Sequence, residues 1–466
     1  MKRFGAVVMA AGRGVRMRSP IPKVLMKMLG KPMVAFPVEM ALELVDGPVV
    51  VVCGEFLDET RLALSPWVSS DRIRFAVQEQ PRGTADAVSC GLAAVGQGEV
   101  ESILILNGDI PAMPHSLTRE LLDAYAGAGT ELALVSCRQP DPTGYGRLIH
   151  DQHGNLTEIR EHKELDPGQE RIDLVNVGVY TVRYDTLSRF LGGVSLSSRQ
   201  REYLLTDLVA EVAQRCKVAE VEAPVAAEVS GINNRAEFAS LLALLRAKRN
   251  RELMESGVGM PHPDSVDVDF GVTVGADTTL EASVAIRGRC AIGAGCLVDR
   301  GSVLVDTTLA DNVEVLPYCM LEGSVVHNGV HIGPFAHTRA GTVLMENSKV
   351  GNFVETKKTI LGPGSKANHL TYLGDSTIGA KVNIGAGTIT CNYDGYKKYQ
   401  TILEDGVFIG SDTQLVAPVR VGKDAVVGAG TTVTKDVPAG ALATSRVDQQ
   451  HREGYSAAKR ERMKKG

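Results

Sequence analysis

The stretch KKTILGPGSKANHLTYLGDSTIGAKVNIGAGTITCN, residues 357–392, determines the expected fold of the carboxyl-terminal half of the chain. Within it an aliphatic residue followed by glycine recurs at Leu361, Leu373, Ile378 and Ile384, close to steps of six or twelve residues. This is the hexapeptide rhythm of a parallel β-helix, in which the aliphatic residue points inward and the glycine permits a tight corner. His369 lies among small residues here, so we expect it outside the core and available for chemistry.

The same rhythm extends over the whole carboxyl-terminal half. Aliphatic residues also precede glycine at Val274, Ile292, Ile332, Val350, Ile409 and Val421. Their separations, often 18 or 12 residues, predict about ten coils of roughly 18 residues between residues 260 and 445, which is enough to share one core. Residues 392–399, NYDGYKKY, interrupt the repeat, and interruptions of a solenoid commonly lie on its binding face.

Length and composition restrict the class of protein. A chain of 466 residues is too long for one core and should form two or three domains. The net charge of -5 argues against a general nucleic-acid binder, and no segment is apolar for 18 residues, so no membrane span is expected. Because the chain starts with a strand and a glycine turn, without a cleavage site, we expect a cytoplasmic protein. The eight cysteines form no C-x-x-C pair, which predicts neither a zinc site nor disulfides.

The amino-terminal half alternates apolar runs with helix-like segments. The apolar runs are residues 4–10, 48–52 and 102–106. This alternation predicts a parallel α/β sheet, whose ligands gather at the carboxyl ends of the strands. A glycine turn follows the first run there, and it lets backbone N–H groups approach a phosphate, while Arg13, Arg16 and Lys23 add positive charge. Glycine turns after strands are common, so the turn alone does not identify a nucleotide site.

The glycine turn and the lysine after it together resemble the sugar nucleotidyltransferase superfamily. Residues 10–17 read A-A-G-x-G-x-R-M, and P-K-V-L follows at residues 22–25. The resemblance implies a catalytic role for Lys23. It also implies nucleotide contacts from Ala10, Ala11, Gly12, Gly14 and Lys23. Val15 stands where members usually carry Thr or Ser.

Asp109 ends the third apolar run, in the motif N-G-D-I-P. A carboxylate at a strand end suits Mg²⁺, which prefers oxygen ligands and is typically shared with substrate phosphates. An Asp at a strand end also caps turns, and this structural interpretation stands beside the first. The resemblance implies that Asp109 binds Mg²⁺ together with Asn233, from the motif S-G-I-N-N-R at residues 230–235.

Two further regions resemble the substrate-recognising parts of the superfamily. Residues 77–87 read VQEQPRGTADA, and the resemblance implies uracil contacts from Gln78, Gly83 and Thr84. Asp86 stands where many members have His, and it receives no role. The motifs Y-G-R, E-H-K and N-V-G resemble the parts that hold N-acetylglucosamine 1-phosphate, although E-H-K alone is commonly a solvated charged strip. The implied sugar-phosphate contacts are Gly146, Glu161, Asn176 and Asn233.

A helix is expected between the two halves. Residues 234–255 contain no glycine or proline and carry leucines at helical spacing, which predicts about six turns. The sequence, with the resemblance to the nucleotidyltransferases, therefore predicts a Rossmann-like nucleotidyltransferase domain (1–231), a helical linker (232–256), a β-helix domain (257–449) and a charged tail (450–466).

The motifs H-L-T-Y-L-G-D and C-N-Y-D-G resemble one bacterial family, the bifunctional N-acetylglucosamine-1-phosphate uridylyltransferases and glucosamine-1-phosphate acetyltransferases. The resemblance covers nearly the whole chain and implies a left-handed β-helix, a homotrimer, and His369 as the general base of acetyl transfer, a role that suits imidazole near neutral pH. Implied sugar-phosphate contacts in this half are Arg339, Lys357, Tyr372 and Asn383. Implied acetyl-CoA contacts are Asn392, Tyr393, Ser411, Ala429 and Arg446. His337 and Ala340 depart from the R-x-R-P-G pattern expected around Arg339.

The resemblance implies one enzyme with two activities and Mg²⁺ as cofactor. Acetyl-CoA acetylates glucosamine 1-phosphate, and UTP then uridylylates the resulting N-acetylglucosamine 1-phosphate, in the service of peptidoglycan and lipopolysaccharide synthesis. Two alternatives stay open from the residues. A single-function pyrophosphorylase could use its β-helix for assembly or allostery, and a non-catalytic regulatory subunit could share the architecture.

Overall fold

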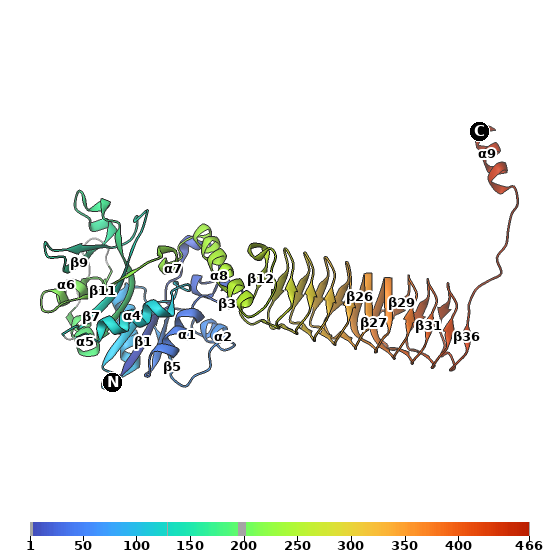
Figure 1. Ribbon diagram of the computed structural model, residues 1–466, viewed down its shortest axis with the longest axis horizontal. Helices are drawn as coiled ribbons and strands as arrows, with labels where there is room; N and C mark the ends of the chain where they lie inside the picture. The colour runs from blue at the N-terminus through green and yellow to red at the C-terminus, as the bar shows by residue number, and fades with distance from the viewer. Residues whose placement is uncertain (1–2, 128, 194–201, 466) are drawn as a thin grey trace. The chain divides into compact units, whose positions relative to one another are not determined.

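The computed structural model describes residues 3–127, 129–193 and 202–465, and the chain divides into two compact units, Met1–Lys248 and Arg249–Gly466 (Figure 1). The first unit is an α/β domain and the second is a β-helix. The finer boundaries given above for the four parts stay predictions. Among the described helices, none combines the length and apolarity needed to span a membrane.

The first unit is built around a mixed sheet with the strand order β11-β7-β10-β6-β1-β4-β5. The strands of this unit are β1 (Phe4–Met9), β2 (Lys27–Met28), β3 (Lys31–Pro32), β4 (Val49–Cys53), β5 (Ile73–Val77), β6 (Ser102–Asn107), β7 (Leu132–Arg138), β8 (Arg147–His150), β9 (Leu156–Arg160), β10 (Leu174–Arg183) and β11 (Ala219–Ala223). The runs predicted from the sequence become β1, β4 and β6, which pair in parallel. Their carboxyl ends therefore share one edge of the sheet, which we call the carboxyl edge.

The α/β fold is confirmed, but the expectation of a parallel sheet is wrong for one part of it, because the sheet is mixed. β10 lies between β6 and β7 and runs antiparallel to both. The reason is the connection from β7 to β10, which contains the β8–β9 hairpin instead of a crossover helix. A chain without such a crossover returns in the opposite direction.

Helices cover both faces of this sheet. Alternate residues of β1 point to opposite faces, with Ala6 and Val8 packing in one hydrophobic cluster and Val7 in the other. Helices α1, α2 and α4 contribute to the cluster around Ala6, while α3, α5 and α6 contribute to the cluster around Val7. The helices of the unit are α1 (Ala35–Leu44), α2 (Leu57–Leu64), α3 (Thr84–Val95), α4 (His115–Tyr125), α5 (Tyr184–Gly193), α6 (Asp207–Ala213) and α7 (Ala226–Val229). Helix α8 (Arg235–Glu255), predicted from residue 234, begins in this unit and ends in the second.

The second unit stacks short parallel strands into coils (Figure 1), and the strand pairings divide these strands into three faces. The first face contains β14 (Thr279–Leu280), β17 (Leu297–Val298), β20 (Glu314–Val315), β23 (His331–Ile332), β28 (Asn383–Ile384), β31 (Phe408–Ile409), β34 (Val426–Val427) and β36 (Leu442–Ala443). The second face contains β12 (Asp267–Val268), β15 (Ala285–Arg287), β18 (Val303–Val305), β21 (Met320–Glu322), β24 (His337–Arg339), β29 (Ile389–Cys391), β32 (Gln414–Val416) and β35 (Thr432–Val433). The third face contains β13 (Thr273–Val274), β16 (Ala291–Ile292), β19 (Thr308–Leu309), β22 (Val325–Val326), β25 (Val343–Leu344), β30 (Thr401–Leu403) and β33 (Val419–Val421). The longer β26 (Lys349–Leu361) and β27 (Lys366–Ile378) each bend around corners and contribute to all three faces, and helix α9 (Tyr455–Lys465) lies in the predicted tail.

The hexapeptide rhythm produces the core of this unit as predicted. Leu361, Leu373, Ile378 and Ile384 are all at most 4% exposed and belong to one continuous hydrophobic cluster. Residues that pair between neighbouring coils are typically 17 or 18 apart, as for Leu304 with Leu321 and Val268 with Ile286. Each buried aliphatic side chain contributes about 1.5–3 kcal/mol relative to an exposed one, so the stack is stabilised along its whole length.

One corner of the β-helix carries an exposed apolar ridge. Four apolar residues lie on successive coils at the corner between the first and second faces: Tyr318, Phe335, Phe353 and Leu370. Each side chain is about half exposed or more. The rings of Tyr318, Phe335 and Phe353 are stacked, with centroids 5.5 Å apart. We refer to these four residues as the apolar ridge. Soluble proteins seldom expose such a continuous apolar strip unless it binds something.

Candidate active sites

The glycine loop of the first unit presents unpaired backbone donors at the carboxyl edge. In the described part of the chain, the backbone N–H groups of residues 11–14 donate to no other protein group. Gly14 has φ +63°, and a Cβ built there would lie 2.5 Å from the Cβ of Lys23. The loop thus packs directly on the Lys23 side chain. Unpaired N–H groups beside a lysine form a pocket for a phosphate.

Lys23 and Asp109 meet at this edge, although they are far apart in sequence. Lys23 Nζ lies 2.5 Å from Asp109 Oδ2, and both side chains are largely shielded from solvent. Gly231 passes beside the carboxylate, since a Cβ built there would lie 3.4 Å from Asp109 Oδ2. That contact brings the segment containing Asn233 to the same place.

These groups fit a divalent cation that is bound mainly by its substrate. Asp109 and Asn233 offer oxygen ligands, and no cluster of three or more metal-binding side chains occurs in the residues that the structure covers. Mg²⁺ typically takes one or two carboxylates from the protein and completes its shell with water and phosphate oxygens. Val15, which replaces the Thr or Ser of other superfamily members, has a side chain that lies outside the described part of the chain.

Gly146, Glu161 and Asn176 also come together. The N–H of Asn176 donates to the Gly146 carbonyl at 2.9 Å, and a Cβ at Gly146 would lie 3.7 Å from both Glu161 carboxylate oxygens. Glu161 accepts a hydrogen bond from Thr206 Oγ1, and burial raises the pKa of its carboxyl group. Asn176 is held by Tyr180 Oη, to which its Nδ2 donates at 2.7 Å. The motifs predicted to hold a sugar therefore form one polar cluster.

The segment predicted to read uracil is folded around helix α3. Gln78 follows β5 and is buried, Gly83 precedes the helix with φ +119°, and a Cβ at Gly83 would lie 2.4 Å from the Tyr203 carbonyl oxygen. Thr84 Oγ1 accepts a hydrogen bond from the N–H of Leu205. The hydroxyl of Thr84 thus supports the fold of the segment.

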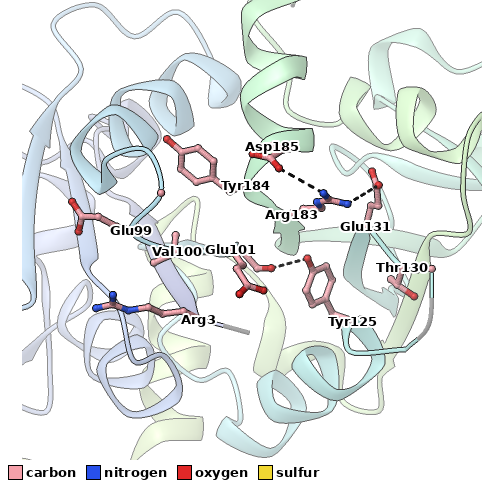
Figure 2. A pocket seen from close by; sticks show the side chains of 13 residues that line it. Arg3, Glu99, Val100, Glu101, Tyr125, Thr130, Glu131, Arg183, Tyr184 and Asp185 are labelled. Atoms are coloured by element: carbon pink, nitrogen blue, oxygen red, sulfur yellow. Dashed lines mark hydrogen bonds and ion pairs between the residues drawn. The ribbon is translucent and has the colours of Figure 1, made fainter. Parts of the chain in front are cut away.

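Another pocket of the first unit lies at the opposite edge of the sheet. Figure 2 shows its lining, which includes Arg3 and Glu101 just before strands β1 and β6 and encloses about 690 Å³. Arg183 forms ion pairs with Glu131 and Asp185 there, at 3.4 and 3.6 Å. This pocket is separate from the carboxyl edge, where Lys23 and Asp109 meet.

In the second unit, His369 lies exposed at the corner that carries the apolar ridge. Its Nδ1 is 2.9 Å from Oδ1 of Asn352, which occupies the equivalent position one coil earlier. With this oxygen as acceptor, Nδ1 carries the proton and Nε2 keeps its lone pair. A neutral imidazole held in this way can accept a proton from a bound substrate.

Cations gather on the second face beside this corner. Arg339 pairs with Lys357 on the next coil, and Lys357 pairs in turn with Gly374. The neighbouring ammonium group of Lys398 lowers the pKa of Lys357, with a smaller effect from Arg339. Neither lysine forms an ion pair within the described residues. Asp375 offsets only part of this repulsion, and two cations held side by side suit an anion such as a phosphate.

Tyr372 and Asn392 lie on the same face as these cations. A Cβ built at Gly374 would lie 2.4 Å from Tyr372 Oη and 2.8 Å from Asn392 Nδ2, so glycine makes room for both polar groups. Asn392 Nδ2 also donates to Asp375 at 2.5 Å. Tyr393 is exposed in the interrupting loop, where its hydroxyl donates to the Gly395 carbonyl.

Asn383 is the exception among the predicted sugar contacts. It lies in β28 on the first face, paired with Lys366, whereas Lys357 and Tyr372 lie on the second face. Within one chain the His369 corner separates Asn383 from the other predicted contacts.

The residues predicted to bind acetyl-CoA continue the His369 corner. Backbone hydrogen bonds connect Gly387 to Leu370, Asp412 to Ala386 and Gly430 to Ser411, so Ser411 and Ala429 occupy the position of His369 on later coils. A Cβ built at Gly428 would lie 3.2 Å from Nη2 of Arg446. Strands stack about 4.8 Å apart, so this row of small residues extends roughly 14 Å from His369 to Ala429. It suits a long, narrow ligand.

Sequence reasoning missed two residues of this site. Asn352 could have been found by counting back one coil from His369, because the spacing of 17 is part of the repeat. Lys398 lies in the interrupting loop, where no period indicates which face a residue approaches.

Comparisons with known proteins agree with this architecture. Residues 6–173 match the model of a MobA-like NTP transferase domain, and residues 400–435 match the bacterial transferase hexapeptide model of six repeats. Among curated proteins, the bifunctional protein GlmU of Pelobacter propionicus is 42% identical over 468 residues, covering all of both chains. That of Sorangium cellulosum is 43% identical over 98% of this chain and 97% of its own. That of an Anaeromyxobacter strain is 44% identical over 98% and 93%. Because these relatives match both units from end to end, the chain belongs to the family of the bifunctional protein GlmU.

Proposed function

We propose that the chain makes UDP-N-acetylglucosamine in two steps, one in each unit. It is a bifunctional acetyltransferase and uridylyltransferase, in keeping with the relatives that span both units. The observation that carries the assignment of residues is the pairing of His369 with Asn352 beside two lysines, Lys357 and Lys398, that form no ion pair within the described residues. A single-function pyrophosphorylase would have no use for that arrangement, so this alternative is not favoured.

In the second unit, glucosamine 1-phosphate places its phosphate on Arg339, Lys357 and Lys398. Its amine nitrogen attacks the thioester carbonyl carbon of acetyl-CoA, and His369 Nε2 accepts the proton that the nitrogen loses. The C–S bond breaks as the new amide bond forms, and the CoA thiolate takes up the proton that His369 accepted, so that CoA leaves as the thiol and the imidazole is again neutral. Acetyl-CoA lies along the row of Ser411 and Ala429, with Arg446 available for its phosphates.

In the first unit, a phosphate oxygen of N-acetylglucosamine 1-phosphate attacks the α-phosphorus of UTP. The bond to the pyrophosphate group breaks, and pyrophosphate leaves. Lys23 and the N–H groups of the glycine loop position the triphosphate and neutralise its charge. Asp109 and Asn233 would hold Mg²⁺, which supplies further charge neutralisation when bound. The acetylated product of the second unit is the acceptor in the first, which fixes the order of the two reactions. We place this chemistry in the cytoplasm.

Glu161→Gln is expected to change sugar binding and stability in opposite directions. Because burial raises the pKa of Glu161, folding favours its protonated form. The free energy of unfolding therefore falls as the pH rises from the pKa of Glu161 in the unfolded state through its higher pKa in the folded state. The isosteric amide removes this cost, so the melting temperature at pH 7 should rise, and the difference should shrink at acidic pH. Losing a charged hydrogen-bond partner should raise the KM for N-acetylglucosamine 1-phosphate about 10–100-fold.

Glu170→Gln is the matched control. Glu170 is exposed, and hydrogen bonds from backbone N–H groups lower the pKa of its carboxyl group, so its replacement should not stabilise the protein. Calorimetry at several pH values and steady-state kinetics would measure both effects. An unchanged KM in Glu161→Gln would remove Glu161 from the sugar site.

The apolar ridge supports a homotrimer in which copies of the β-helix cover it. Replacing Phe335 and Phe353 with serine should weaken association by at least about 10²-fold, since each aromatic side chain contributes about 1.5–3 kcal/mol when buried. Light scattering after size exclusion would then show a monomer at micromolar concentration. Tyr396→Ser is the control, because Tyr396 is 93% exposed in the interrupting loop, away from the ridge. A threefold mass in the double variant would contradict the proposed interface.

A further inference from the structure

Asp86, which sequence reasoning left without a role, contacts the residue predicted to read the base. Gln78 Nε2 donates to Asp86 Oδ2 at 2.8 Å and to the Gly83 carbonyl oxygen at 3.1 Å. Gln78 is only 6% exposed, so these contacts form in a sheltered place. Asp86 stands in the first turn of helix α3, where its negative charge is favourable.

The two partners of Gln78 fix which end of its amide faces them. A carboxylate and a carbonyl oxygen only accept hydrogen bonds, so the group between them must be the –NH₂ end of the amide. Both N–H donors of Gln78 are then used. The carbonyl oxygen Oε1 must point elsewhere, and among the described residues it has no hydrogen-bond partner.

Among the described residues, Oε1 of Gln78 is not one of the fully buried atoms that lack a partner, so it stays accessible and can accept a hydrogen bond from a ligand. The backbone N–H of Gly83 likewise donates to no described protein group. The segment therefore offers one acceptor and one donor. The uracil edge is the complement of this pair, because N3–H donates and O4 accepts. Cytosine has the reverse pattern, an acceptor at N3 and a donor at N4.

We propose that Asp86 is a positioning residue that sets base specificity by locking the Gln78 amide with Oε1 toward the base. This inference rests on the proposed uridylyl transfer and predicts that the site prefers UTP to CTP. Without Asp86, the amide is free to turn its –NH₂ end toward the base, where it would accommodate N3 of cytosine. The effect acts on nucleotide binding, since Asp86 itself touches no reacting atom.

The test compares Asp86→Leu, Asp86→Asn and wild type with UTP and CTP. In Asp86→Leu, kcat/KM for UTP should fall about tenfold, the equivalent of one hydrogen bond, through KM with kcat changed less than twofold. The ratio of kcat/KM for UTP over CTP should also fall about tenfold. In Asp86→Asn the introduced amide oxygen still accepts from Gln78 Nε2, so this variant should keep the ratio within about twofold of wild type.

Two further variants guard against a general loss of structure. Glu59 occupies the matching place in the first turn of α2 and is exposed, so Glu59→Leu should leave the ratio unchanged. In a Gln78→Leu background, adding Asp86→Leu should cause no further loss of selectivity, because the two residues act as one unit. A kcat for UTP within about twofold of wild type, together with an unchanged melting transition of the first unit, reports that this unit is folded in the Asp86 and Glu59 variants.

The outcomes separate the inference from the function on which it rests. If wild type released no pyrophosphate from UTP, the proposed site itself would fail. If wild type turns over UTP and Asp86→Leu keeps the full preference for UTP over CTP, only the role of Asp86 is overturned. Equal loss of selectivity in Asp86→Asn and Asp86→Leu would also overturn it, because the asparagine retains the acceptor.

Discussion

His369→Gln is expected to lower acetyl transfer about 10²–10⁴-fold, the usual contribution of a general base. The amide side chain keeps roughly the size of imidazole but cannot take a proton from the substrate amine. Since the phosphate site of Arg339, Lys357 and Lys398 is untouched, the KM for glucosamine 1-phosphate should change little. The loss is measured as the rate of acetyl-CoA consumption, which is monitored through the release of the free CoA thiol.

Asn352→Ala provides the comparison within the same pair. Removing the acceptor of His369 Nδ1 leaves the ring free to rotate and to exchange tautomers, so acetyl transfer should fall by a smaller factor, about tenfold. Uridylyl transfer from supplied N-acetylglucosamine 1-phosphate should be normal in both variants. Normal acetyl transfer in His369→Gln would remove the histidine from the reaction.

Asp109→Asn should abolish pyrophosphate release, with a loss of about 10³-fold or more. The change removes a negative charge that Mg²⁺ requires and also the ion-pair partner of Lys23. Raising the Mg²⁺ concentration should recover part of the activity, because the remaining ligands still bind the ion weakly. Pyrophosphate release at several Mg²⁺ concentrations measures both effects.

Removal of divalent metal from wild type is the matching chemical experiment. A chelator should stop uridylyl transfer and leave acetyl transfer intact, since the second site uses a histidine and cations from side chains. Acetyl transfer should also be normal in Asp109→Asn. Undiminished pyrophosphate release in that variant would show that Asp109 does not hold the metal.

The sequence correctly predicted features that follow from a local repeat or from the position of a residue at the end of a strand. Aliphatic residues before glycine became the β-helix core, because their inward direction follows from the repeat alone. Gly14 and Asp109 came to one edge of the sheet because both follow parallel strands.

Other features depend on contacts that no local pattern encodes. The antiparallel placement of β10 follows from the hairpin before it, and the approach of Lys398 to Lys357 follows from the path of an inserted loop. The position of Asn383 on a separate face was open to prediction, since it stands 17 residues after Lys366, but a resemblance read residue by residue does not show faces. Asp86 acquired a role only when its distance to Gln78 was known.

The coil spacing implies that the two units reach their native states by different routes. In the second unit nearly every strand pairs with one a single coil away, so structure can begin at any coil and grow outward by adding neighbours. In the first unit Ala6 pairs with Leu104, and β1 cannot complete its pairing until that later strand has been synthesised. Closing such long loops slows folding. We therefore expect the nucleotidyltransferase unit to fold after the β-helix, even though the ribosome makes it first. We also expect it to depend more on chaperones.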